Sequence, residues 1–189
     1  MVYTMVRRRW REMESLRKST YTIDDIYALP DGERAELIDG QIYDMAPPGR
    51  THQKISWKLH QAIANYIDSK NGDCEVYAAP FAVFLNEDDV NYVEPDISVI
   101  CDPSKLDEKG CHGAPDWIIE IVSESSRRMD YMIKLFKYRS AGVKEYWIVD
   151  QKKQQTIVYN FEHDTMEEYA FKEEIPVGIY NEFSIMMEF

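Results

Sequence analysis

A short apolar segment that contains one carboxylate constrains this sequence most. Residues 117–122 read Trp-Ile-Ile-Glu-Ile-Val and follow a Gly-Ala-Pro-Asp turn segment. Such a run of β-branched and aromatic residues predicts a strand in the protein interior. Side chains alternate between the faces of a strand, so Glu120 points away from the face that carries Ile119 and Ile121. Because ionised carboxylates are rarely buried without a partner, Glu120 should face a basic group or a bound metal ion.

A second acid has a similar setting. Asp96 follows Pro95 at the start of the apolar run 97–100. If the two strands are neighbours in one sheet, Asp96 and Glu120 come close enough to hold one divalent ion. Mg²⁺ prefers oxygen ligands and usually takes only one or two protein carboxylates. Glu36, in a predicted hairpin strand, is a third candidate acid.

Lys134 is the best candidate for a cation beside these acids. It lies on the helix predicted to follow the Glu120 strand, and Asp130 precedes it by about one helical turn. Hydrolysis of a phosphodiester needs an activated water and a cation that offsets the charge of the transition state. Two simpler interpretations stay open: Glu120 forms a structural salt bridge, and Asp130 with Lys134 forms a solvent-exposed helix pair.

The spacing of apolar residues predicts the remaining elements. Residues three and four apart predict amphipathic helices over 51–70 and 128–140, and a short capped helix over 22–29. Asp39-Gly40 predicts the turn of an N-terminal hairpin over 34–45. Other strands are predicted at 75–85, 96–101, 145–150 and 155–159, with another near 168–171. Strands flanked by two substantial helices indicate an α/β or α+β domain with a mixed sheet.

The charge is unusual for a protein that handles nucleic acid. The chain of 189 residues has a net charge of −12, whereas phosphate binding draws most of its affinity from Lys and Arg. Residues 1–19 are the exception, with six basic and two acidic residues. We interpret them as a basic N-terminal extension, either a simple leader or an arm that contacts phosphate or a partner chain. Residues 20–189 are expected to form a single domain.

No apolar run approaches the roughly 20 residues that a membrane span needs, and residues 1–19 lack the apolar core of a signal peptide. We therefore expect a cytoplasmic protein without a membrane partner. The cysteines are Cys74, Cys101 and Cys111, and none forms a CxxC pair. This pattern favours buried or bystander thiols over a disulfide framework or a zinc site.

Six sequence blocks occur in an order that resembles a known family. They are ELIDG at 36–40, His52, EPDISVI at 94–100, GAPDWIIEIVS at 113–123, DYMIKLFKY at 130–138 and GVKEYWIVD at 142–150. This order, over residues 22–177, is similar to that of the Uma-two family within the PD-(D/E)XK nuclease superfamily. The resemblance implies a restriction-endonuclease-like core, with a mixed β-sheet flanked by helices and an N-terminal hairpin.

The resemblance also implies roles for individual residues. Asp96 and Glu120 match the acids that bind the metal ion in this superfamily. The sequence departs from the superfamily pattern at Val122, where the triplet that begins at Glu120 should end in lysine. In relatives of this type a lysine from the following helix takes that place, and Lys134 occupies the matching position.

Four further residues lie in or near the predicted site. Glu36 matches an early glutamate of the family and would complete the acidic cluster, and the carbonyl of Ile121 would supply another metal ligand. His52 either contacts a phosphate or an acid of the site, or it is a capping or surface residue. Tyr138 is expected to pack rather than to take part in chemistry.

These observations favour a Mg²⁺-dependent (or Mn²⁺-dependent) endonuclease that hydrolyses DNA phosphodiester bonds. The alternatives are a catalytically silent module that keeps the nuclease fold for dimerisation or partner binding, and a nuclease directed at RNA. A homodimer is the expected assembly, since symmetric dimers are the commonest oligomers.

Overall fold

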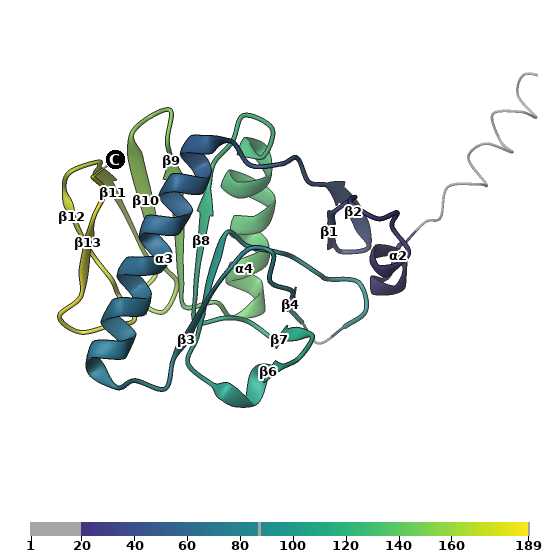
Figure 1. The fold of residues 1–189 in the computed structure, drawn as a ribbon, viewed down its shortest axis with the longest axis horizontal. Helices are drawn as coiled ribbons and strands as arrows, with labels where there is room; N and C mark the ends of the chain where they lie inside the picture. Colours follow the sequence, from purple (N-terminus) through teal and green to yellow (C-terminus); the bar gives the residue numbers. More distant parts are fainter. Residues whose placement is uncertain (1–19, 87, 189) are drawn as a thin grey trace, which may run out of the picture.

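The computed structural model describes residues 20–86 and 88–188. The basic extension predicted at residues 1–19 lies outside the described residues. Among the described residues, a six-stranded sheet runs through the centre of the molecule, with helices packed on its faces (Figure 1). No helix in this part of the chain is both long enough and apolar enough to cross a membrane.

The helices and strands occur along the chain in the following order. They are α2 (Ile23–Tyr27), β1 (Ala35–Ile38), β2 (Gln41–Asp44), α3 (Arg50–Lys70), β3 (Glu75–Ala78), β4 (Val83–Phe84), β5 (Ile97–Ile100), η1 (Pro103–Lys105), β6 (Leu106–Asp107), β7 (Gly110–His112), β8 (Trp117–Ile121), η2 (Met129–Lys134), α4 (Leu135–Ala141), β9 (Glu145–Asp150), β10 (Gln155–Asn160), β11 (Thr165–Ala170), β12 (Glu174–Pro176) and β13 (Ser184–Met186).

The central sheet has the strand order β11-β10-β9-β8-β5-β3. Strands β8 and β9 are parallel, and the other neighbours are antiparallel. The predicted mixed sheet is therefore confirmed. Strands β5 and β8 are direct neighbours, with Ile97 opposite Ile119. Extending this register by one residue places Asp96 opposite Glu120.

The two faces of the sheet bury different halves of the core. On one face, Trp117 and Ile119 pack with Ile55 and Ile63 of α3. On the other face, Ile118 packs in a second cluster that includes Tyr138 of α4 and Ile148 of β9. Figure 1 shows β8 between α3 and α4. Glu120 lies on the same face of β8 as Ile118, so the strand places its side chain in the protein interior.

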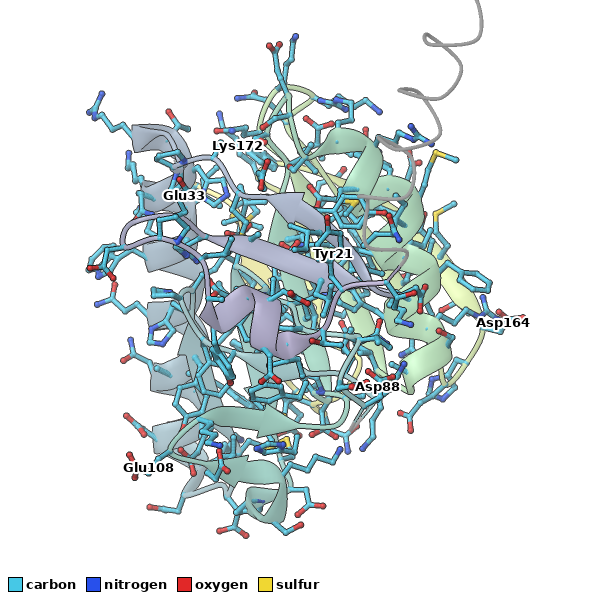
Figure 2. All side chains as sticks on the ribbon, turned by 90° about the vertical axis from the view of Figure 1, so that its right-hand side faces the viewer. Tyr21, Glu33, Asp88, Glu108, Asp164 and Lys172 are labelled. Carbon is cyan, nitrogen blue, oxygen red and sulfur yellow. A yellow bond between two sulfur atoms is a disulfide. The ribbon has the colours of Figure 1, made fainter. Side chains whose placement is uncertain are left out.

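The N-terminal hairpin forms as the Asp-Gly pair predicts. Asp39 and Gly40 have φ values of 49° and 72°, the left-handed values that such a two-residue turn needs. Strand β1 also pairs with the loop before β5, because the N–H groups of Leu37 and Tyr92 each donate to the other residue's carbonyl. Figure 2 views this hairpin side, with Tyr21 beside it. These bonds attach the hairpin next to the central sheet.

Two predicted elements are divided in the structure. The strand predicted over 75–85 becomes β3 and β4 in different sheets, with Pro80, which has no N–H to donate, between them. The helix predicted over 128–140 begins as the π-helix η2 and continues as α4. Apolar spacing does not separate these two helix types, because their periods differ by less than one residue per turn. Gly142, at φ 95°, ends the helix as expected.

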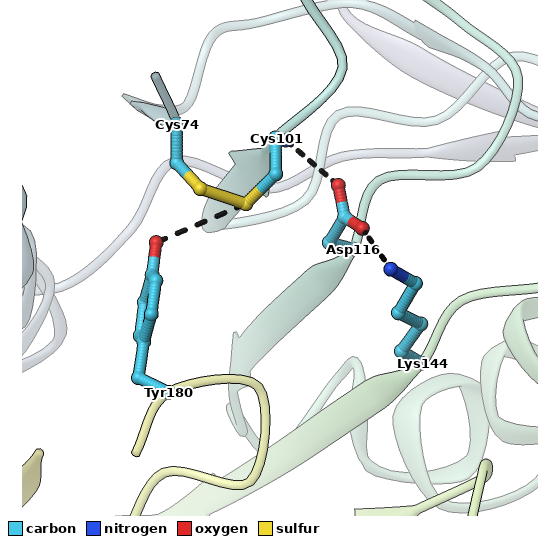
Figure 3. Close-up of a disulfide and its surroundings, with 5 residues drawn as sticks. All are labelled: Cys74, Cys101, Asp116, Lys144 and Tyr180. Atoms are coloured by element: carbon cyan, nitrogen blue, oxygen red, sulfur yellow. Dashed lines mark hydrogen bonds and ion pairs between the residues drawn. A yellow bond between two sulfur atoms is a disulfide. The ribbon is translucent and has the colours of Figure 1, made fainter. Parts of the chain in front are cut away.

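The prediction that the cysteines are all free is wrong. Cys74 and Cys101 form a disulfide, shown in Figure 3, and Cys111 is the free, buried cysteine. The sequence pattern could not reveal this, because the pairing depends on the register of β3 with β5. Glu75 lies opposite Ile100, so the residues just beyond this pair, Cys74 and Cys101, meet at the end of the two strands.

The disulfide predicts the thiol content of the protein. Unfolded in denaturant without reductant, the protein should react with a thiol reagent at one cysteine, and after reduction at three. In the folded state Cys111 should react slowly at pH 8, because burial raises the pKa of its thiol to about 11. Three reactive thiols before reduction would contradict the disulfide.

Asp150 is a polar anchor at the end of β9. Its carboxylate accepts hydrogen bonds from Arg127 Nη1 at 2.6 Å, from the Tyr131 hydroxyl at 3.0 Å and from the backbone N–H groups of Lys152 and Lys153 at 3.1 Å. Burial alone would raise the pKa of Asp150, but these donors lower it from 3.8 to about 2. Asp150 therefore stabilises the fold above its unfolded pKa, and this contribution is lost as the pH falls toward 2.

We expect Asp150→Asn to lower the free energy of unfolding by about 2 kcal/mol at pH 7, as a pKa difference of nearly two units implies. The difference from the parent protein should shrink between pH 4 and pH 2, which urea denaturation at each pH measures. Asp164→Asn is the control. Asp164 also pairs with an arginine, but its side chain is 75% exposed at the periphery seen in Figure 2, so its removal should cost less than about 1 kcal/mol. Equal losses in both variants would contradict the assignment.

Candidate active site

A cavity of about 670 Å³ opens between the N-terminal half of α3, the hairpin and the start of η2. Every site residue that the sequence predicts lines it. These residues come from five separate segments and are Glu36, His52, Asp96, Glu120, Ile121, Asp130 and Lys134.

Lys134 lies between two carboxylates at the base of the cavity. Its Nζ donates to Glu36 Oε1 and to Glu120 Oε1, each at 2.8 Å, and all three side chains are 5% exposed. Burial lowers the pKa of Lys134, but Glu120 and Glu36 raise it more strongly, so its pKa lies well above the usual range. Lys134 is therefore a cation that donates hydrogen bonds. The partner that Glu120 needs inside its apolar strand is this ammonium.

Two further groups hold the same carboxylates. The Tyr138 hydroxyl donates to Glu120 Oε1 at 2.6 Å, and the N–H of Glu94 donates to Glu36 Oε1 at 3.1 Å. The expectation that Tyr138 only packs was incomplete. Its ring does pack edge-on against Tyr146, but its hydroxyl also fixes Glu120. The sequence signal for this contact is the spacing of Lys134 and Tyr138, which lie four residues apart and therefore on one face of the helix.

Asp96 is held by the neighbouring strand and by α3. Its Oδ2 accepts the Ile121 N–H at 2.7 Å and lies 3.1 Å from His52 Nε2. His52 is buried, so it is not a surface or simple capping residue. Burial lowers the pKa of His52, but its hydrogen bonds and the charge of Asp96 raise it more strongly, to a value above the usual range.

Asp130 is only 2% exposed, and its Oδ1 has no hydrogen-bond partner among the described residues. Burial and the nearby carboxylates of Glu36 and Asp96 raise the pKa of Asp130 to about 6, against the opposing effects of Lys134 and Ser126. The interpretation of Asp130 and Lys134 as a solvent-exposed helix pair is therefore wrong. Both residues lie on the π-helical turn η2, a geometry that is frequent at functional sites.

The cluster contains more acidic than basic groups. Burial raises the pKa of Glu120 well above its usual range; Lys134 opposes this effect, while Asp130, Asp96 and Glu36 add to it. Four carboxylates thus share one ammonium and one histidine. An added cation would relieve their mutual repulsion.

The donor set suits a hard divalent ion with few protein ligands. Glu120 Oε2 and Asp96 Oδ1 have no recorded hydrogen bond with a described residue, while the other oxygen of each acid is held by the protein. Among the described residues, no three or more His, Cys, Asp or Glu side chains form a ready metal cage. Mg²⁺ commonly binds through one or two carboxylates and completes its shell with water and substrate oxygens, so two acids and the Ile121 carbonyl fit it.

The buried cluster yields a stability prediction. Lys134→Met should lower the free energy of unfolding by about 3–5 kcal/mol, because it leaves Glu36 and Glu120 buried without their cation. Lys137→Met is a matched control one turn along. Lys137 also binds an acid of the hairpin, Asp39, but that side chain is 71% exposed, so a smaller loss of about 1 kcal/mol is expected. Urea denaturation measures both, and equal losses would contradict a strongly coupled cluster.

Comparisons with known proteins agree with this architecture. A crystal structure described as a putative nuclease belonging to DUF820, from Anabaena variabilis ATCC 29413, superposes with a TM-score of 0.68 at 22% identity, over 84% of this chain and 89% of that chain. At this identity the match shows a shared fold. The predicted nuclease-type α/β core is confirmed.

Two sequence matches add to this. The uncharacterized protein slr1290 of Synechocystis sp. (strain ATCC 27184 / PCC 6803 / Kazusa) is 33% identical over 98 residues, which are 52% of this chain and 50% of that protein. The match thus spans about half the length of the curated relative. A family model described as "Uma2: Putative restriction endonuclease" matches residues 23–184. The chain, with its cavity of clustered acids and one lysine, belongs to the Uma2 family.

Proposed function

We propose that this protein is a divalent-metal-dependent endonuclease that hydrolyses DNA phosphodiester bonds in the cavity described above. The observation that carries the proposal is the position of Asp96 and Glu120. Asp96, just before β5, lies opposite Glu120 of the adjacent strand β8, both line the cavity, and each keeps one oxygen that forms no hydrogen bond with a described residue. The family description and the shared fold support a nuclease in general. The metal and the DNA substrate are our proposal.

Asp96, Glu120 and the carbonyl of Ile121 would hold Mg²⁺ or Mn²⁺. When bound there, such an ion would polarise a phosphoryl oxygen and lower the pKa of a bound water. The protein supplies the rest of the arrangement. Ile121 N–H and His52 hold one oxygen of Asp96 in place, which would leave its other oxygen to an ion in the cavity that Asp96 lines.

Lys134 would act as an electrostatic donor rather than as a base, since its ammonium is retained by two carboxylates. From this position it can orient an attacking water or stabilise negative charge that develops on the phosphate. Glu36 and Tyr138 are positioning residues in this scheme: Glu36 holds Lys134, and Tyr138 holds Glu120. Asp130 Oδ1 is buried and forms no hydrogen bond within the part of the chain that the structure describes, so it can accept a hydrogen bond from a water in the cavity.

Two observations favour a second candidate, a catalytically silent nuclease-fold module. Lys134 and Tyr138 already satisfy one oxygen of Glu120 without any ion, and the chain has a net charge of −12. In such a module the cluster would serve stability alone, and the protein would act through dimerisation or partner binding.

Metal binding distinguishes these two candidates. Mn²⁺ at about 100 times its dissociation constant should stabilise the parent protein by about 2.7 kcal/mol, which raises the melting temperature by roughly 5–10 °C for a chain of this size. Glu120→Gln and Asp96→Asn should abolish this shift and also abolish Mn²⁺-dependent nicking of supercoiled plasmid. Thermal unfolding and the nicking assay are run on the same samples.

Glu145→Gln is the matched control. Glu145 is another fully buried glutamate on the neighbouring strand β9, where it accepts hydrogen bonds from Trp147 Nε1 and the Ile179 N–H. Its replacement should lower the melting temperature but leave the Mn²⁺ shift and nicking intact. Nicking by Glu120→Gln at the parent rate would overturn the proposed site, and absence of both shift and nicking in the parent would favour the silent module.

A further inference from the structure

The helix that borders the cavity carries a local positive charge. Residues 45–67 contain three basic residues, Arg50, Lys54 and Lys58, and no acid, although the whole chain has a net charge of −12. Their spacing of four places them in a row along α3. Arg50 and Lys54 are exposed and form no ion pair with a described residue. Such a row, free of acidic neighbours on its helix, is suited to bind phosphates.

Trp57 lies beside this row. Its side chain is 61% exposed and lines the cavity. The chain's tryptophans in the core, Trp117 and Trp147, are fully buried. Exposure of a large aromatic ring costs the hydrophobic stabilisation that burial would provide, about 25 cal/mol per Å². An exposed tryptophan at the edge of a polar cavity is therefore a candidate contact surface for a ligand.

The helix geometry orders these groups. At about 100° per residue, Gly49, Gln53 and His60 face the cavity, Arg50, Lys54 and Lys58 lie on the adjoining outer face, and Trp57 falls between the two sets. His52, which contacts Asp96, precedes Trp57 by five residues, or about 7.5 Å along the helix axis. If one phosphate of a bound polynucleotide lay at the acid cluster, a base one or two nucleotides away along the polynucleotide would thus reach Trp57.

The exposed Trp57 ring and the small number of cations on α3 favour an unpaired polynucleotide strand over a duplex. A duplex is held mainly through many phosphate contacts, often 6–10. The helix beside the cavity offers two exposed cations that form no ion pair with a described residue, Arg50 and Lys54, because Lys58 Nζ already donates to the Glu188 carbonyl. Unpaired strands combine fewer ionic contacts with stacking of bases on aromatic side chains. In a duplex, the bases are stacked on each other and their faces are not available to Trp57.

We infer that the substrate is an unpaired polynucleotide strand, with one base stacked on the Trp57 indole and the adjacent phosphates beside Arg50 and Lys54. This inference rests on the proposed nuclease function, because that function is the reason to expect that the polynucleotide runs toward Asp96 and Glu120. It assigns Trp57 as a specificity-determining residue that contacts substrate outside the acid cluster.

Binding is measured first, in EDTA so that metal-dependent cleavage does not occur, by anisotropy of a short fluorescein-labelled oligonucleotide. The three probes are single-stranded DNA, single-stranded RNA of the same sequence and the DNA duplex. The parent protein should bind a single strand more tightly than the duplex, and Trp57→Ala should weaken single-strand binding by roughly 5- to 150-fold, the effect of one stacked base. Trp57→Phe should restore most of the affinity.

Phe136→Ala is the control, since Phe136 is an aromatic residue that is 75% exposed on α4 and does not line the cavity. It should bind like the parent. Tryptophan emission gives an independent reading: the single strand should quench the parent, and this quenching should be lost in Trp57→Phe. Equal or tighter binding of the duplex, or single-strand binding by Trp57→Ala at the parent affinity, would overturn the inference.

Nicking and single-strand cleavage with Mn²⁺ then separate this inference from the proposed function. Cleavage that requires Glu120 but is unchanged in Trp57→Ala would leave the nuclease in place and reject the stacking role. Strand binding that requires Trp57, with no cleavage by the parent of any probe, would reject the nuclease and keep the strand-binding surface. Preference between the DNA and RNA strands identifies which polynucleotide the site accepts.

Discussion

The Lys134 ammonium, placed between Glu36 and Glu120, is the interaction on which the site depends. It joins three parts of the chain that are distant in sequence: the hairpin strand β1, the central strand β8 and the helical turn η2. Without it, two carboxylates would be buried side by side in an apolar setting, which strongly disfavours their ionised forms. The ion cluster therefore couples the position of the hairpin to the position of the helix.

The second constraint is the pairing of β5 with β8. Because the strands are antiparallel neighbours, the residue before β5 meets the residue near the end of β8, and Asp96 is brought across from Glu120. The acids that matter are thus placed by backbone hydrogen bonds, while Lys134, Tyr138 and His52 fix the direction of each carboxylate. Backbone pairing thus determines which acids lie close together, and side-chain contacts determine how their carboxylates are oriented.

Much of this could be predicted from the sequence. The alternation in residues 117–122, the Asp-Gly turn and the apolar spacing of α3 are local patterns, and each produced the expected element. A buried acid in an apolar strand was a sufficient signal for Glu120, and the order of sequence blocks indicated the family.

Features that depend on three-dimensional register were not accessible in this way. The disulfide requires knowledge of which residues lie opposite each other in β3 and β5. The π-helical form of η2 is hidden because its period is close to that of an α-helix. The spacing of Tyr138 and Lys134 places them on one helix face, but the contact of Tyr138 with Glu120 depends on how that helix packs on the sheet. Trp57 gave no local signal either, since an exposed and a buried tryptophan look alike in sequence.

The bond between Cys74 and Cys101 has a consequence for the acid cluster. It closes a covalent loop that contains all of β3 and β5, and therefore Asp96. A shift of β5 by one residue against β3 would move the Asp96 carbonyl away from the Ala79 N–H, whose hydrogen bond it accepts at 3.1 Å. The cross-link at the far end of these two strands opposes such a shift, even if their hydrogen bonds open briefly. The backbone that carries a carboxylate of the site is thereby tied to two sulfur atoms at the other end of the strand pair.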